Sequence, residues 1–160
     1  PSIDFTTINE HIFFFFVFQE KSDYPPESFS LKSVVYESWS DYFQFDYLET
    51  ETIYSSLFYS YNTNPVISIG STGSTTIVWE VTGDGLYYRF GGINDNGLNL
   101  IGSNAKLTGT TYLSKNPSIA VSKKAGSSDI THLVWEENNS IKHFAFHSAP
   151  PGTITTALSG

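Results

Sequence analysis

Residues 116–121 read Asn-Pro-Ser-Ile-Ala-Val, and residues 130–137 read Ile-Thr-His-Leu-Val-Trp-Glu-Glu. A turn rich in lysine, glycine and serine joins these two stretches, and Asn138 and Asn139 then lead into a third apolar stretch over residues 140–146. Runs of β-branched and aromatic residues bounded by turn residues are typical of β-strands. This part of the chain therefore predicts three antiparallel strands in succession.

The same pattern occurs twice more in the chain. In the second copy, Asn-Pro at 64–65 precedes an apolar strand that ends in Trp79 and Glu80. The first copy has diverged, and Phe18 stands where the other copies have a tryptophan. The order of proline, turn, aromatic residue and acidic or amide residue is kept in all three copies, which indicates a repeated structural unit. We expect three approximate repeats, over residues 1–64, 65–116 and 117–160.

Each repeat also contains a weaker candidate for a fourth strand. Four short antiparallel strands in every repeat of roughly 40–60 residues are the sequence signature of a propeller blade. The predicted fold is therefore all-β, with about three four-stranded antiparallel blades that form part of a larger or oligomeric β-propeller. The candidates for the fourth strand are residues 42–47 or 53–59 in the first repeat, 98–101 in the second and 153–158 in the third.

The second strand of each repeat is almost continuously apolar, over residues 13–18, 77–79 and 133–135. A strand that is covered on both faces has this composition. Because a single four-stranded sheet cannot bury both of its faces, each sheet is expected to stack on a neighbour.

Composition and charge exclude several classes of protein. Charged residues make up 15% of the 160 residues and aromatic residues 16%, against about 25% charged residues in an average soluble domain. These values argue against a helical bundle, a coiled coil or a disordered chain. The net charge of −8 argues against a nucleic-acid partner. The longest apolar run, residues 12–18, is too short to span a membrane.

The chain has no cysteine and no methionine, and it begins with Pro1. The lack of cysteine excludes disulfides and thiolate metal sites but leaves the cellular compartment open. The missing methionine leads us to expect a processed chain or a fragment. The expected partners are therefore further blades of a longer chain or further copies of this chain, with a glycan or a surface protein as another possibility.

The repeat resembles the blades of sialidase-like bacterial β-propellers, which are related to the Asp-box repeats of extracellular proteins. The resemblance implies a propeller fold and an extracellular or cell-surface location. Family sialidases hold a carboxylate with three arginines, whereas this chain has a single arginine, Arg89. The Asp-box turn is also absent, since residues 82–85 read Thr-Gly-Asp-Gly, a hairpin turn. The resemblance therefore does not support enzyme activity.

The candidate ligand-binding residues are two recurrent tryptophan–glutamate pairs and the single arginine. The tryptophans could stack on a sugar while the adjacent carboxylates accept hydrogen bonds from its hydroxyl groups. Alternatively, each tryptophan fills the space between adjacent blades and each glutamate ends its strand, which explains the recurrence without a ligand. Arg89 could clamp a carboxylate or stack on a ring, or it could extend from the edge of a blade. The candidate residues are Trp79, Glu80, Arg89, Trp135 and Glu136.

Metal and modification sites are weaker candidates. Three histidines of the third repeat could bind a metal ion, although no other copy repeats them at the corresponding positions. Oxygen-bearing residues in glycine-rich turns could bind calcium, although such residues commonly serve turn geometry. An Asn-Xaa-Ser sequence at Asn138 is a glycosylation acceptor if the source organism glycosylates such sites. The histidines are His132, His143 and His147, and the calcium candidates are Asp84, Asp95 and Asn96.

The longest insertion in the repeat, residues 36–61, is aromatic and acidic. It is expected to form either a contact surface or a widened outer pair of strands. Taken together, the sequence predicts a non-enzymatic extracellular or surface propeller segment that acts in adhesion, assembly or ligand binding. The alternatives are a carbohydrate-binding, lectin-like propeller and a fragment of a sialidase-like glycoside hydrolase.

Overall fold

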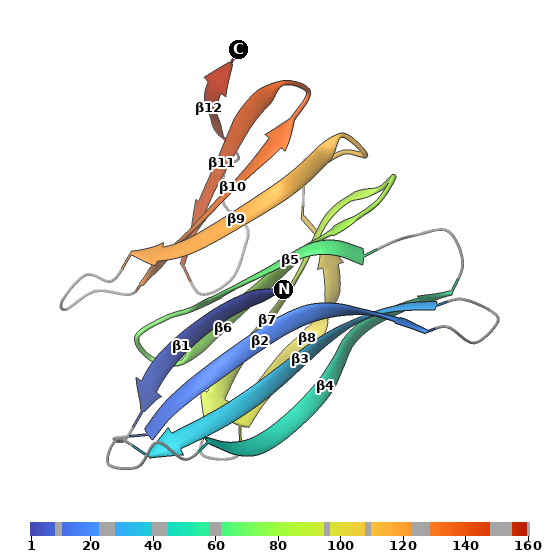
Figure 1. Ribbon diagram of the computed structural model, residues 1–160. Helices are drawn as coiled ribbons and strands as arrows, with labels where there is room; N and C mark the ends of the chain where they lie inside the picture. The colour runs from blue at the N-terminus through green and yellow to red at the C-terminus, as the bar shows by residue number, and fades with distance from the viewer. Residues whose placement is uncertain are drawn as a thin grey trace.

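The computed structural model describes residues 1–8, 11–22, 28–39, 45–57, 62–94, 97–107, 110–122, 129–147 and 155–159. These residues form three antiparallel sheets of four strands each, and the strands of each sheet are adjacent in the order of the chain (Figure 1). The prediction of an all-β fold with four-stranded antiparallel sheets is confirmed. The described residues contain no helix that is long and apolar enough to cross a membrane.

The first sheet contains the longest strands of the chain. Its third and fourth strands have 12 and 13 residues and pair along almost their whole length. Much of the aromatic and acidic insertion lies in these two strands, while residues 40–44 and 58–61 lie outside the described part. The four strands are β1 (Ser2–Ile8), β2 (His11–Ser22), β3 (Ser28–Trp39) and β4 (Phe45–Leu57).

The second and third sheets repeat this arrangement with shorter strands. Strands β4, β8 and β12 include the described parts of the segments that were predicted as fourth strands. The second sheet contains β5 (Asn62–Ile69), β6 (Ser74–Val81), β7 (Gly85–Asn94) and β8 (Gly97–Lys106). The third contains β9 (Ser114–Ser122), β10 (Ile130–Glu137), β11 (Ser140–Phe146) and β12 (Thr155–Ser159).

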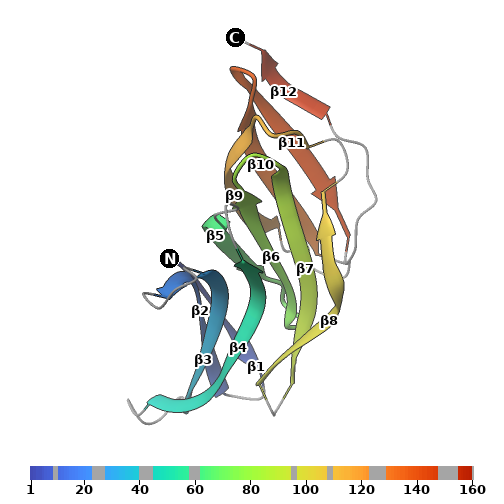
Figure 2. The same cartoon turned by 90° about the vertical axis from the view of Figure 1, so that its right-hand side faces the viewer.

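The three sheets stack face to face in the order of the chain, and two apolar cores fill the spaces between them (Figure 2). We call the face of a sheet that is directed toward the preceding repeat its leading face, and the opposite face its trailing face. The first core joins the trailing face of the first sheet (Phe13, Phe15, Val17, Leu31, Val35) to the leading face of the second (Ile67, Ile69, Ile77, Trp79, Val81). The second core joins the trailing face of the second sheet (Val66, Val78, Leu86, Tyr88, Phe90) to the leading face of the third (Ile119, Leu133, Trp135, Phe144, Phe146).

Only the middle sheet of the described stack has a neighbouring sheet on both sides. Residues 75–79 of β6 are all buried, as expected for a strand that is covered on both faces. In β2 and β10, buried residues alternate with partly exposed ones. The expectation of burial on both faces is therefore wrong for these two strands within this chain, because no described sheet covers their outer faces.

The first strands of the three sheets, β1, β5 and β9, lie side by side (Figure 1). Each is an edge strand, so alternate backbone N–H groups point away from its own sheet. Side chains of β1 satisfy two such groups of β5. The Ile67 N–H donates to Ser2 Oγ over 3.3 Å, and the Ile69 N–H donates to Asp4 Oδ2 over 2.8 Å. These bonds fix the first sheet relative to the second.

The tryptophan of the third sheet provides a test of the packing between sheets. Trp135 is 1% exposed, and truncation of a buried tryptophan to alanine removes its core contacts and leaves a cavity. We expect Trp135→Ala to lower the free energy of unfolding in urea by about 3–5 kcal/mol. Tyr112→Ala is the matched control, because Tyr112 is 70% exposed, and it should change stability by less than about 0.5 kcal/mol. Equal effects of the two substitutions would contradict the packing described above.

Candidate functional site

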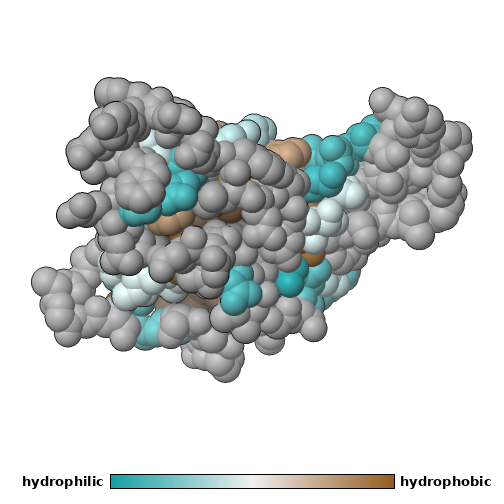
Figure 3. Space-filling model, turned by 90° about the horizontal axis from the view of Figure 1, so that it is seen from below, coloured by the Kyte–Doolittle hydropathy of each residue, from teal (hydrophilic) through white to brown (hydrophobic). Residues whose placement is uncertain are grey.

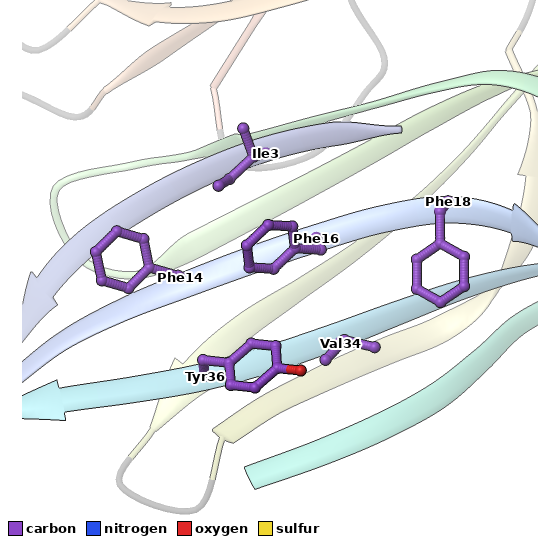
Figure 4. A pocket seen from close by; sticks show the side chains of 6 residues that line it. All are labelled: Ile3, Phe14, Phe16, Phe18, Val34 and Tyr36. Atoms are coloured by element: carbon purple, nitrogen blue, oxygen red, sulfur yellow. The ribbon is translucent and has the colours of Figure 1, made fainter. Parts of the chain in front are cut away.

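The leading face of the first sheet is an open apolar surface. Six side chains from β1, β2 and β3 line a groove of about 720 Å³ on this face (Figure 4). No described part of the chain covers the groove, whereas the leading faces of the second and third sheets are covered by the preceding sheet. The lining residues are Ile3, Phe14, Phe16, Phe18, Val34 and Tyr36.

The alternation of side chains along β2 explains how this surface forms. Successive residues of a strand point to opposite faces, so Phe13 and Phe15 enter the first core while Phe14, Phe16 and Phe18 lie on the leading face. The Phe16 ring meets the Tyr36 ring edge-on, with 5.8 Å between the ring centroids. An edge-on contact of this kind is a favoured arrangement of two aromatic rings.

Two residues of β1 add exposed apolar surface to this face, Ile3 in the lining of the groove and Phe5 outside it. Ile3 is 57% exposed and Phe5 is 60% exposed, and the Phe5 ring lies 6.1 Å from the Phe14 ring. Apolar surface is also visible between polar residues in the space-filling view from below (Figure 3). Large apolar residues that gather on one exposed face commonly mark an interaction surface.

The same face also carries two charged groups, Lys32 and Glu20. Lys32 pairs with Phe18 in the strand ladder, and its Nζ forms an ion pair with Glu20 Oε2 over 2.6 Å. Among the residues that line the groove, the Tyr36 hydroxyl is the one side-chain group that can donate or accept a hydrogen bond. The face is therefore chemically suited to apolar contact and carries no group in its lining that could act as a nucleophile with an adjacent base.

The structure places the two recurrent tryptophans in separate cores. Trp79 lies in the first core at 0% exposure, and Trp135 lies in the second core at 1% exposure. A sugar could stack on either ring only if two sheets separated. Ligand binding by these residues stays a prediction, and their observed contacts are packing contacts between sheets.

The two recurrent glutamates meet at Asn116, the asparagine of the second Asn-Pro pair. The Asn116 N–H donates to Glu80 Oε2 over 3.4 Å, and Asn116 Nδ2 donates to Glu136 Oε2 over 3.3 Å. Asn64 Nδ2 donates to Glu80 Oε2 over 3.0 Å. This series of polar contacts links the second sheet to the third.

A lysine also contacts the second of these glutamates. Lys115 Nζ lies 3.1 Å from Glu136 Oε1, and hydrogen bonds from Lys115 and then Asn116 lower the pKa of the Glu136 carboxyl.

Backbone conformation explains why asparagine occupies both positions in this network. Asn64 has a φ of 50° and Asn116 a φ of 53°, in the left-handed region that asparagine tolerates better than most residues. The Asn-Pro pairs repeat in the sequence, but their asparagines were not predicted to be contact residues. Their recurrence next to proline was the available signal.

The remaining candidate ligand residue, Arg89, lies on the leading face of the second sheet. It pairs with Ile77 across the β6–β7 ladder, and its side chain is partly buried between the first and second sheets. It is separated from the glutamate network, because Glu80 lies on the opposite, trailing face with Leu86. The structure thus distributes the five candidate residues over both cores and one polar network instead of gathering them in one pocket.

Two of the three candidate histidines come together. His132 Nδ1 lies 3.1 Å from His143 Nε2, and the rings stack on the trailing face of the third sheet with 5.4 Å between centroids. His147 is not part of this pair, since its Nδ1 contacts the Asp129 carbonyl oxygen at 3.2 Å. The described residues contain no group of three or more histidine, aspartate or glutamate side chains that could hold a metal ion.

The described calcium candidate, Asp84, is engaged by two donors. Tyr87 donates from its hydroxyl to Asp84 Oδ2 over 2.6 Å, and Lys106 Nζ contacts Asp84 Oδ1 at 2.5 Å. The hydrogen bond from Lys106, followed by that from Tyr87, lowers the pKa of the Asp84 carboxyl. An ammonium group beside the carboxylate disfavours a cation there. The other two candidates, Asp95 and Asn96, lie outside the described residues.

The glycosylation candidate lies in an exposed hairpin turn. Asn138 and Asn139 have φ values of 51° and 59° and connect β10 to β11. Two successive residues with positive φ are typical of the tight turns that match the twist of a hairpin. Modification of Asn138 stays a prediction.

Comparison of the chain with protein families, with curated proteins and with solved structures finds no match. The resemblance to sialidase-like repeats therefore rests on the sequence pattern alone.

The left-handed conformation of Asn116 gives a testable consequence. Alanine at this position combines the strain of a positive φ with the loss of the amide contact, whereas glycine loses the contact without the strain. We expect Asn116→Ala to lower the free energy of unfolding by about 1–2 kcal/mol and Asn116→Gly to lower it by less. Denaturant unfolding of both variants measures the difference. Equal stability of the two variants would contradict a conformational role for this residue.

Proposed function

We infer that this chain is a segment of a β-propeller and that it functions through assembly. Three features support the proposal: each sheet is a four-stranded meander, successive sheets stack face to face, and their first strands lie together. These features are expected of neighbouring propeller blades. In such a fold, each sheet needs a neighbour on both faces.

The observation that carries the proposal is the open leading face of the first sheet. The corresponding faces of the second and third sheets hold residues that are 0–5% exposed, such as Trp79, Leu133 and Phe146. On the first sheet, Ile3 and Phe5 are more than half exposed. Covering this face with another sheet removes apolar surface from water, which favours association.

The chemistry of the described residues favours assembly over catalysis. The single arginine packs between two sheets, and the glutamates at 80 and 136 accept hydrogen bonds from asparagines that link two sheets. A catalytic carboxylate pair would instead face a cavity that a substrate can enter. We therefore propose a non-enzymatic role.

Carbohydrate binding is less well supported than assembly. Sugar-binding sites combine aromatic rings with several polar groups that orient the hydroxyl groups of the sugar. The open groove carries a single tyrosine hydroxyl among six lining residues, and both recurrent tryptophans are buried. An extracellular or cell-surface location is proposed on the basis of the sequence resemblance alone.

Self-association in solution tests the proposed function. We expect the protein to sediment as a species of at least twice 17.8 kDa, in a concentration-dependent manner. The double variant Ile3→Lys/Phe5→Lys places two charges on the exposed face and should sediment as a 17.8 kDa monomer, because burying an unpaired charge opposes association.

The matched control is Tyr112→Lys. Tyr112 is 70% exposed but lies in the connection between the second and third sheets, away from the leading face. This variant should associate like the unmodified chain. A monomeric unmodified chain that unfolds cooperatively would contradict assembly through this face.

A further inference from the structure

Both contacts between sheets join a leading face to the trailing face of the preceding sheet. This common direction indicates which kind of face the open leading face of the first sheet would pack against. Trp79 and Trp135 both lie on leading faces, and each packs against the trailing face of the preceding sheet. Phe18 occupies the corresponding sequence position in the first repeat and also lies on a leading face. The missing neighbour of the first sheet is therefore a trailing face.

The third sheet carries a trailing face that no described residue covers. This face contains Val134, His132, His143 and Ala145, which are partly exposed, and Ile141, which is 41% exposed. The trailing faces of the other two sheets are already buried in the two cores. One chain thus presents both halves of a further contact between sheets, at opposite ends of its stack (Figure 2).

The side chains of the two open faces are complementary in size. The leading face of the first sheet is bulky, with rings at Phe5, Phe14, Phe16, Phe18 and Tyr36. The trailing face of the third sheet carries the small residues Ser118, Ala120 and Ala145 beside the larger side chains named above. Stacked sheets pack well when large residues on one face meet small residues on the other.

The hydrogen bonds between β1 and β5 indicate which residues would meet in the further contact between sheets. Ser2 directly follows the proline of the first repeat. Its Oγ accepts a hydrogen bond from the N–H of Ile67, which is the second residue after the proline of the second repeat. Ser118 directly follows the proline of the third repeat, and the second residue after Pro1 is Ile3. A further contact of the same kind therefore pairs Ser118 Oγ with the Ile3 N–H.

The next position along the edge is consistent with this pairing. Asp4 accepts from the Ile69 N–H, but the residue that corresponds to Asp4 in the third repeat is Ala120, which has no side-chain acceptor. The N–H group that would lack an acceptor is that of Phe5. It already donates to Asp4 Oδ1 over 2.9 Å within its own strand. The contact therefore leaves neither of these two edge N–H groups without an acceptor.

We propose that a second copy of this chain docks the trailing face of its third sheet on the leading face of the first copy's first sheet, in a head-to-tail arrangement. This proposal rests on the proposed function. Two copies joined reciprocally in this way form a closed ring of six sheets, within the usual range of four to eight propeller blades. Closure covers every open face, whereas a non-closing arrangement of the same contact produces filaments.

Engineered cysteines test this arrangement, because the chain contains no cysteine of its own. Two single variants, Ile3→Cys and Ser118→Cys, are mixed under reducing conditions and then oxidised. Each substitution removes only a few atoms from a contact that extends over a whole sheet face, so the reduced variants should still associate, and sedimentation checks this. The expected product is a covalent dimer, at twice 17.8 kDa, in the mixture and in neither variant alone. Tyr112→Cys mixed with Ile3→Cys is the control and should give no such product.

The outcomes separate the docking arrangement from the proposed function. If Ile3→Cys alone forms a covalent dimer and the mixture forms no additional one, two first sheets dock face to face. This result would overturn the head-to-tail arrangement but not the proposed assembly. An unmodified chain that is oligomeric, without cross-linking in the mixture, would overturn it in the same way. A monomeric unmodified chain would overturn both.

Discussion

A four-stranded sheet has two faces, and the stability of this protein depends on covering them. The second sheet meets this requirement, since Ile77, Val78 and Trp79 in one strand are each at most 1% exposed. Among the described residues, the two outer sheets each have one covered face and one face without a neighbouring sheet. Burial contributes about 25 cal/mol per Å² of apolar surface, so an open aromatic face is a strong source of association free energy. The architecture and the proposed assembly therefore have the same physical origin.

Polar contacts at the margins determine how the sheets are placed on one another. Asp4 binds the free edge of β5, and Glu80 connects Asn64 to Asn116. Asp129, which precedes β10, accepts hydrogen bonds from the backbone and hydroxyl groups of Ser71 in the β5–β6 turn. Apolar packing alone tolerates sliding between sheets, whereas directional bonds to specific backbone groups define one arrangement. The proposed contact between copies uses a bond of the same kind, from the Ile3 N–H to Ser118 Oγ.

The sequence was sufficient to predict the strands, but not which faces are covered. The repeated order of proline, turn and aromatic residue located most strands, and the asparagine pair at 138–139 marked a hairpin. The consecutive phenylalanines of residues 13–16 contain no alternation, so they could not show that Phe14 and Phe16 lie on an open face. The role of Asn116 depends on a glutamate 36 residues away, and that of Asp4 on a strand of the next sheet, so neither was accessible from local pattern.

Hydrogen exchange measured at several protein concentrations shows whether the first sheet needs a further neighbour, because it reports the stability of each sheet separately. We expect the amides of β6 to exchange slowest at every concentration. We also expect protection of β2 and β10 to rise with concentration as their outer faces become covered. Protection of β2 that equals that of β6 and does not change with concentration would contradict the claim that the first sheet needs a further neighbour.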